Sequence, residues 1–272
     1  MTPEEPPPFL VDPAANKPAN KTRRAGTWAT ITLAAAKILS SFKFALIFLK
    51  TGGSMLLMMW LYAQIWGWPF AAGFVLLIFV HECGHLIVAR AFGLKVGAPI
   101  FIPFMGAYIA LKQAPRDAWM EACVGIGGPL FGTLGAATCW GIYFTTGNPL
   151  FRAIAYSGFF LNLFNLTPIT PLDGGRIAAA VSPWLWLVGL AVMGAMMIYH
   201  FNLLLLVIVA LSVPRIFRLL RGREASPAYF AVAPGRRWTM AVLYFGLAGF
   251  LATGMELTKL EPRSPAPIQG TL

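Results

Sequence analysis

The stretch FVLLIFVHECGHLIVARAFGL, residues 74–94, decides the fold because it places ionisable side chains inside an apolar run. His81, Glu82 and His85 stand in a segment long enough to cross the roughly 30 Å hydrocarbon core of a bilayer as a helix. A charged residue at the bilayer centre costs at least about 2.5 kcal/mol on insertion scales, so such groups usually mark functional sites. The stretch therefore predicts a transmembrane helix that carries chemistry.

The composition of the whole chain agrees with a membrane protein. Of its 272 residues, 58% are hydrophobic and only 11% are charged, whereas soluble domains carry about 25% charged residues. The formal net charge is +11, but Lys and Arg accumulate in the cytoplasmic loops of membrane proteins, and we expect no nucleic-acid partner. The sequence predicts an all-α polytopic protein of the lipid bilayer.

Apolar runs divide the chain into about six to seven transmembrane helices. We expect spans near 52–67, 69–91, 118–145, 149–167, 183–199, 201–217 and 237–255. This division leaves most Lys and Arg on the side of the N-terminus, including Arg215, Arg218, Arg221, Arg223, Arg236 and Arg237. By the positive-inside rule, the N-terminus is cytoplasmic. We expect a multi-pass protein of the cell membrane, and its compact design without an organellar presequence favours a prokaryotic plasma membrane.

Composition also assigns the segments around these spans. Residues 1–26, rich in Pro, Asn and charge, are expected to form a disordered cytoplasmic tail. Residues 27–51 mix apolar runs with lysines and predict an interfacial helix, with a span that begins there as the alternative. The remaining divisions are an intramembrane core at 52–217, a basic cytoplasmic loop at 218–236, an additional transmembrane helix at 237–255 and a C-terminal tail at 256–272.

The stretch VGAPIFIPFMGAYIALK, residues 96–112, does not have the pattern of a span. Pro99, Pro103 and Gly106 interrupt it, and a lysine flanks it at either end. Its β-forming residues on both sides of a glycine-containing turn predict a β-hairpin that dips into the membrane from the cytoplasm. Non-helical backbone at that depth must pack on protein or line a wet cavity. An ordinary interfacial loop is the alternative.

His81 and His85 are four residues apart, so a helix places both on one face, where they can bind one metal ion. Glu82 occupies the position of the general base in the HExxH pattern of zinc metalloproteases. A buried cluster of hydrogen-bonded polar side chains is the alternative, but it does not explain why two of only three histidines share a turn with a carboxylate. The pattern predicts one zinc ion per chain.

A catalytic zinc site usually has three protein ligands and keeps its fourth position for water. His200 is the remaining histidine, but the predicted topology places it on the opposite side of the membrane. Asp117 is expected to begin the helix that follows it. Asp173, in NLTPITPLDGG at 165–175, is therefore the favoured ligand, and Glu121 is the alternative. Asp173 could instead be a helix cap or a turn residue.

The residues around Asp173 predict a break in the fourth span. Pro168 and Pro171 interrupt the helix, and the backbone groups that they free must line a polar cavity. Gly174 and Gly175 are expected to let the backbone pass close to whatever Asp173 binds.

A side-chain amide in the same polar stretch could donate a hydrogen bond to a developing oxyanion. Asn165 is the favoured candidate, because it opens the stretch that leads to Asp173. Asn162, three residues earlier, could be the one that faces the site instead.

Together, HECGH at 81–85 and NLTPITPLDGG at 165–175 resemble the site-2 protease family of intramembrane zinc metalloproteases. The similarity covers about residues 52–215. It implies a zinc site and a catalytic pair, with His81, His85 and Asp173 as ligands, Glu82 as the catalytic glutamate and Asn165 stabilising the tetrahedral intermediate.

The resemblance also implies that the segment 96–112 is the family's membrane-dipping hairpin, which presents substrate by strand addition. The chain departs from the family at Gly132, in GIGGPLFGT at 125–133, where many members carry asparagine. A polar contact is then either missing there or supplied elsewhere. We expect a compact form without a PDZ or CBS domain, in which selectivity would come from the hairpin, the membrane-embedded cleft or a regulatory membrane partner.

These observations predict a zinc-dependent intramembrane endopeptidase that cleaves transmembrane protein or peptide substrates, in or near their transmembrane segments, with a metal-activated water. Its active site would open to the cytoplasm. A membrane transporter is one alternative, but no relay of acidic or histidine side chains leads to the other face. A non-catalytic zinc-binding scaffold is the other, but a structural site needs no general base at Glu82.

Overall fold

A computed structural model describes residues 51–103, 106–222 and 227–259. These residues fall in one compact unit, Leu49–Leu272. The expected tail at 1–26 and nearly all of the expected interfacial helix at 27–51 lie outside the described residues.

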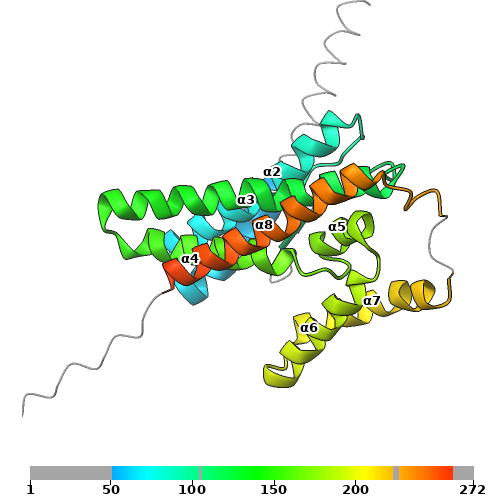
Figure 1. Ribbon diagram of the computed structural model, residues 1–272. Coiled ribbons are helices and arrows are strands. Elements are labelled where there is room, and N and C mark those ends of the chain that lie inside the picture. The colour runs from blue at the N-terminus through cyan, green and yellow to red at the C-terminus, as the bar shows by residue number, and fades with distance from the viewer. Residues whose placement is uncertain (1–50, 104–105, 223–226, 260–272) are drawn as a thin grey trace, which may run out of the picture. The chain divides into compact units, whose positions relative to one another are not determined.

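Helices form most of the described chain (Figure 1). A first helix covers residues 51–66. It is followed by α2 (Trp68–Ala91), α3 (Ala118–Thr146), α4 (Pro149–Asn165), α5 (Asp173–Val181), α6 (Leu185–Tyr199), α7 (Leu203–Leu220) and α8 (Pro234–Thr258). Each of the seven expected spans, all within the described residues, is thus mostly helical, and the short helix α5 follows the proline-containing break.

Four of these helices, α2, α3, α7 and α8, are long and apolar enough to cross a membrane by length and composition. The prediction of six to seven spans is therefore not confirmed. The reason is helix length, because α4 has 17 residues and α6 has 15. At 1.5 Å per residue they measure about 26 and 22 Å, less than the roughly 30 Å of a bilayer core.

Side-chain caps mark where several helices begin. Asp117 accepts a hydrogen bond from the backbone N–H of Met120 at 2.7 Å, which confirms its predicted role at the start of α3. Asn148 caps α4 in the same way, just ahead of Pro149. Asn202 caps α7 after the short connection from α6.

The predicted hairpin is present as two antiparallel strands, β1 (Ile100–Ile102) and β2 (Gly106–Tyr108). The pairing continues outward to a bridge between Val96 and Leu111, but in a register shifted by one residue. The extra residue lies on the first strand, in the stretch that contains Pro99, which has no N–H to donate to a ladder. The entry of this hairpin into a membrane stays a prediction.

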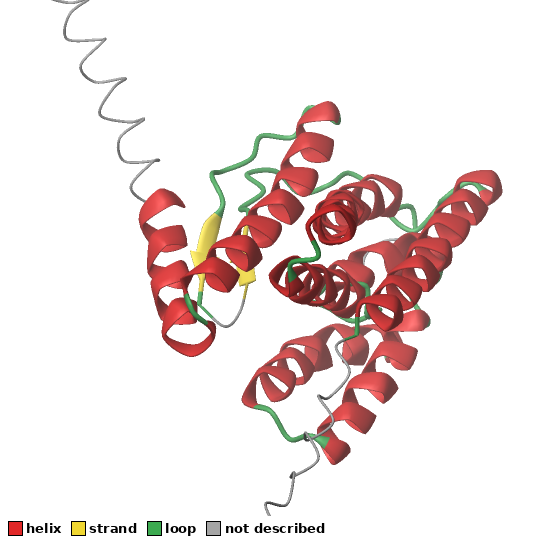
Figure 2. Cartoon of the chain, turned by 90° about the vertical axis from the view of Figure 1, so that its left-hand side faces the viewer, coloured by secondary structure: helices red, strands yellow, loops and turns green. Residues whose placement is uncertain are grey.

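The hairpin is anchored to the first described helix, beside which Figure 2 shows the two strands. The backbone N–H of Phe101 donates to the Ser54 hydroxyl at 3.1 Å. The buried Phe101 side chain belongs to an apolar cluster with Met58, Tyr62 and Val75. The hairpin is therefore held against the helix at 51–66 and against α2.

The core that positions the site is centred on α3, which packs against α2, α4 and α5. In Figure 1, α3 and α8 run side by side, and α8 also contacts α4 and α5. Glycines let α2 and α3 touch at the backbone, since a methyl group on Gly84 would lie 2.2 Å from the carbonyl oxygen of Gly127. Small residues permit such close crossings of membrane helices.

Candidate metal centre

The helical spacing on α2 brings His81, Glu82 and His85 into one buried turn. The two imidazole rings meet edge to face, and their Nε2 atoms are 3.1 Å apart. The side chains of His81 and His85 are only 4% and 9% exposed. Two ring nitrogens are therefore directed at the same buried point.

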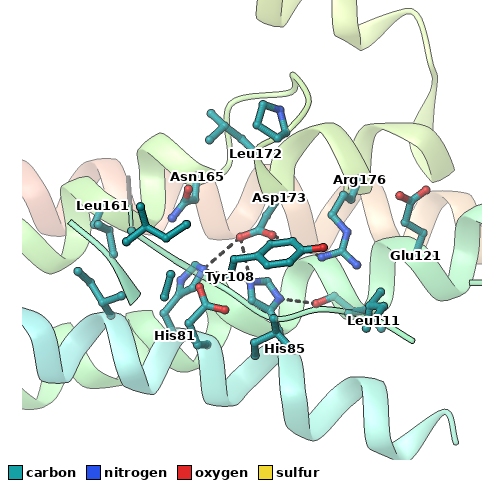
Figure 3. Close-up of a pocket in the computed structure, with 18 of the residues that line it drawn as sticks. His81, His85, Tyr108, Leu111, Glu121, Leu161, Asn165, Leu172, Asp173 and Arg176 are labelled. Atoms are coloured by element: carbon teal, nitrogen blue, oxygen red, sulfur yellow. Dashed lines mark hydrogen bonds and ion pairs between the residues drawn. The ribbon is translucent and has the colours of Figure 1, made fainter. Parts of the chain in front are cut away.

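Asp173, the first residue of α5, completes this arrangement (Figure 3). Its Oδ2 atom lies 3.1 Å from Nε2 of His81 and 3.1 Å from Nε2 of His85. The residue at the N-cap position of α5 is Leu172, and Asp173 lies in the first turn, so Asp173 is not the cap residue.

The three donor atoms fit a zinc ion. Their three separations are all 3.1 Å, and the corners of such a triangle lie about 1.8 Å from its centre. A point slightly above that plane can thus be about 2.0 to 2.1 Å from every donor, which is the usual zinc distance to histidine nitrogen and carboxylate oxygen. Within the described residues, His81, His85 and Asp173 form a group that could hold a metal ion.

Each histidine has a second partner at its Nδ1 atom. Nδ1 of His85 lies 2.8 Å from the carbonyl oxygen of Val124 on α3. Nδ1 of His81 lies 2.8 Å from the side-chain Oδ1 of Asn162 on α4. Such outer contacts usually fix the tautomer and orientation of histidine ligands.

The two candidate asparagines of α4 therefore have different surroundings. Asn162 is fully buried and contacts His81, whereas Asn165 lines the cavity beside the donor atoms. From the sequence, they were alternatives for a single role, donation of a hydrogen bond to the developing oxyanion. The structure places Asn165 where it could reach a substrate and Asn162 behind a histidine.

Two further glycines of α3 make room for the site, and sequence analysis did not single out Gly128. A methyl group on Gly128 would lie 2.2 Å from Nε2 of His85 and 2.7 Å from Nε2 of His81. A methyl group on Gly132 would lie 2.2 Å from Oδ1 of Asn162. The amide of Asn162 therefore fills the space beside Gly132, which agrees with a polar contact supplied from another position.

Gly174 and Gly175 have a packing role that the sequence did not suggest. These glycines permit close approach to the break that precedes α5. A methyl group on Gly174 would lie 2.1 Å from the carbonyl oxygen of Leu166, and one on Gly175 would lie 2.5 Å from the carbonyl carbon of Ile169. The first turn of α5 is packed directly on this backbone.

Residues of the break, including Pro171 and Leu172, line the cavity as expected, but two carbonyls near the break accept hydrogen bonds from side chains. The carbonyl of Leu166 accepts a hydrogen bond from the Tyr244 hydroxyl of α8. The carbonyl of Gly175 accepts one from the indole N–H of Trp186 at 2.8 Å. Protein side chains, rather than a polar cavity, therefore satisfy these carbonyls.

Glu121, the alternative third ligand, is engaged elsewhere. Its Oε2 atom accepts a hydrogen bond from the Tyr229 hydroxyl at 2.6 Å and lies 3.8 Å from a guanidinium nitrogen of Arg215. Burial and this hydrogen bond raise the pKa of Tyr229 above its ordinary value, so the phenol keeps its proton. His200, the third histidine, is exposed at the end of α6.

The donor atoms form part of the wall of a cavity of about 560 Å³ (Figure 3). Glu82 and Asn165 line the same cavity, and so do residues of the hairpin, including Tyr108. Arg176, one turn after Asp173, also lines it, with a guanidinium nitrogen 3.9 Å from Oδ1 of Asp173. The i, i+3 spacing of these two residues could have indicated their contact from sequence.

This arrangement has the components of metal-assisted hydrolysis. Three donor atoms converge on one point, a carboxylate stands one residue from a candidate ligand, and an amide lies across the cavity. The predicted roles of these residues stay predictions, while their shared position is a feature of the structure.

Comparison with known proteins finds matches to part of the chain. The family model described as peptidase family M50 matches residues 69–158, which include His81, Glu82 and His85. The match ends before Asn165 and Asp173. A zinc metalloprotease of Methanocaldococcus jannaschii is 32% identical over 109 residues, which are 38% of this chain and 31% of that protein. The chain therefore matches less than a third of the length of this relative.

A solved structure, the site-2 protease from Methanocaldococcus jannaschii, aligns with 76% of this chain and 89% of its own, at 20% identity and a TM-score of 0.40. The family match and the zinc metalloprotease relative agree with the two motifs of the sequence. On these two findings, residues 69–158, which carry the HECGH motif, are similar to peptidase family M50 and to a zinc metalloprotease.

Proposed function

We propose that this chain is a zinc-dependent endopeptidase that hydrolyses peptide bonds in or near the transmembrane segments of membrane proteins. One observation carries the proposal: His81, His85 and Asp173 converge within a cavity that Glu82 also lines. The match of residues 69–158 to peptidase family M50 supports it. Its substrate would be a transmembrane protein or peptide in the lipid bilayer.

His81 and His85 would hold the ion through their Nε2 atoms, and Asp173 would hold it through Oδ2. When bound there, zinc supplies a Lewis acid that polarises the substrate carbonyl and lowers the pKa of a water molecule to about 7. Three protein ligands leave room for that water. We propose one zinc ion per chain.

Glu82 would act as the general base and then as the general acid. Its carboxylate accepts a proton from the attacking water and passes that proton to the leaving amine of the cleaved bond. Asn165 would donate a side-chain N–H to the oxygen on which negative charge develops. Both residues line the cavity from different helices, α2 and α4, so a peptide bond can lie between them.

The hairpin would guide the substrate. Residues of β1 and β2 line the cavity together with the catalytic residues, so an extended peptide lying along a strand would be held close to Glu82. A locally unwound helix exposes such an extended segment, and strand addition uses the backbone groups that unwinding releases. We propose that the opening of this cavity faces the cytoplasm of a multi-pass protein in a prokaryotic plasma membrane.

The test is cleavage of a membrane-embedded reporter peptide by the purified chain in liposomes, with zinc content measured in parallel. Glu82→Gln keeps the size of the side chain but removes the base. We expect it to retain about one zinc ion per chain while the cleavage rate falls by about 10²- to 10⁴-fold, the usual contribution of a general base.

Glu121→Gln is the matched control, because it makes the same change at another glutamate that lines the cavity. It should keep most of the activity. Full cleavage by Glu82→Gln would contradict the mechanism, and loss of zinc from that variant would make Glu82 a ligand instead.

A further inference from the structure

We propose that Asn162 is a positioning residue that holds the ring proton of His81 on Nδ1, and that Gly132 must be glycine to admit the Asn162 amide. The inference deepens the proposed function and rests on it, since it concerns how a zinc ligand is prepared. It assigns a task to two residues that do not themselves touch the substrate.

The orientation of the Asn162 amide is fixed by its neighbour on α4. The side-chain Nδ2 donates to the carbonyl oxygen of Gly158, one turn earlier, at 2.7 Å. A carbonyl oxygen can only accept, so the nitrogen end of the amide must face Gly158. The oxygen end, Oδ1, then faces Nδ1 of His81 at 2.8 Å.

That orientation determines the tautomer of His81. An amide oxygen can only accept a hydrogen bond, so Nδ1 of His81 must carry the proton. A neutral imidazole with its proton on Nδ1 has its lone pair on Nε2. This is the atom that faces Asp173 and His85, each at 3.1 Å. Asn162 therefore presents His81 as a ligand through Nε2.

The two histidines are held by different kinds of group. Nδ1 of His85 contacts two backbone groups, the Val124 carbonyl at 2.8 Å and the Gly128 N–H at 3.3 Å, which substitution of a side chain leaves in place. His81 depends on a side chain, that of Asn162. A single substitution can thus remove the support of His81 and leave that of His85 as an internal reference.

Gly132 sets the space in which the amide lies. A methyl group on Gly132 would lie 2.2 Å from Oδ1 and 2.6 Å from Nδ2 of Asn162, well inside van der Waals contact. Asn162 is fully buried, so its amide has little room to move aside. Any side chain at position 132 must therefore displace the group that holds His81.

The first experiment measures zinc affinity by competition with a chelator in the full chain in detergent. Asn162→Leu is close in size but has no acceptor, and we expect its zinc affinity to fall by about 10- to 100-fold, the usual effect of losing an outer-shell partner. Thr133→Val is the matched control, because it removes another buried hydrogen bond, from the Thr133 hydroxyl to the Pro129 carbonyl at 2.6 Å, that does not involve the histidines. Its affinity should stay near that of the original chain.

A double-mutant cycle then tests whether a side chain at position 132 acts by displacing the Asn162 amide. Gly132→Ala should weaken zinc binding when Asn162 is present, although alanine is the better helix former. In an Asn162→Ala background the amide is gone, and Gly132→Ala should cause no additional loss. Equal losses in the two backgrounds would overturn the coupling between the two positions.

Nitrogen-15 NMR of the imidazoles in the zinc-loaded chain gives a readout that a merely structural role would not change. The chain has only three histidines. Asn162→Leu should shift the Nδ1 signal of His81 and leave that of His85 unchanged. Zinc affinity equal to that of the original chain, or an unchanged His81 signal, would overturn the proposal. These measurements need no cleavage, so they can fail while the proteolysis proposal stands, and the reverse also holds.

Discussion

The two halves of the candidate site are built in different ways. Three of its groups come from five consecutive residues of α2, where the helix alone sets the distances between His81, Glu82 and His85. The other half comes from the break between α4 and α5, and Asp173 is 92 positions from His81. Only the packing of α5 against α3 and α8 brings Asp173 to the histidines.

This difference indicates which substitutions should affect the site. On α2, an intact helix sets the spacing of the three groups, while Asn162 and Val124 contact the histidine rings. The half at the break depends on contacts that are distant in sequence, such as the hydrogen bond from Trp186 to Gly175 and the one from Tyr244 to Leu166. Substitutions near the break should thus affect zinc binding and rate without touching a ligand.

The largest effect is expected from removing Asp173 itself. Asp173→Ala should reduce bound zinc from about one ion per chain to nearly none after dialysis against a chelator, and cleavage should be lost, because two histidines alone make an incomplete zinc site. Glu121→Ala should keep its zinc. Metal analysis of the two purified variants measures the difference.

His200→Ala is the control for the histidines, since His200 is exposed and outside the donor group. It should leave zinc content and cleavage unchanged. A zinc-free Glu121→Ala variant beside a zinc-loaded Asp173→Ala variant would reverse the assignment of the third ligand.

A smaller effect is expected from Asn165. Asn165→Leu removes the amide proposed to stabilise the oxyanion and should lower kcat by about 10²- to 10³-fold, as for other oxyanion donors. Zinc affinity should not change, because Asn165 is not in the donor group. Steady-state cleavage and chelator competition on the same sample separate the two quantities.

Asn162→Leu is the natural comparison, three residues away on α4, and is expected to show the opposite pattern of weakened zinc binding. If Asn165→Leu loses zinc while its rate with saturating zinc is normal, the two asparagines have been assigned the wrong way round.

The smallest effect is expected from Trp186→Phe, which keeps an aromatic ring but leaves the Gly175 carbonyl without its indole donor. A buried carbonyl that loses its partner costs about 1 to 3 kcal/mol, so the thermal unfolding temperature should fall and zinc affinity should weaken moderately. Trp238→Phe, at a position 73% exposed, should do neither. An unchanged unfolding temperature for Trp186→Phe would show that the break does not depend on this contact.

Much of the secondary structure was predictable from the sequence, because it depends on local pattern. Apolar runs gave the positions of the helices, Asp117 marked the start of α3, and β-forming residues around Gly106 indicated the hairpin. The number of spans was less predictable. Hydropathy does not reveal that α6 has only 15 helical residues, since the helix ends are set by caps and turns.

The packing role of a glycine is difficult to predict from the sequence. Gly174 and Gly175 follow a candidate ligand, which suggested that they make room for what it binds. They make room for the backbone of Leu166 and Ile169. Gly128 gave no signal of its own, and Gly132 was noted only as a departure from the family, yet the histidine rings and the Asn162 amide occupy the space beside them. Which neighbour a glycine admits depends on the path of a distant segment.

The sequence by itself determined that His81, Glu82 and His85 share one helical turn within an apolar segment, because four residues are about one turn of any α-helix. It favoured Asp173 over Glu121 as the third ligand and Asn165 over Asn162 as the amide that faces the site, but it gave Asn162 no role of its own. Only the tertiary structure decided that Asp173 meets the histidines, that Glu121 meets Tyr229, and that Asn162 lies behind His81. Those contacts depend on how α4 and α5 pack on α2 and α3, and no local pattern in the chain specifies that packing.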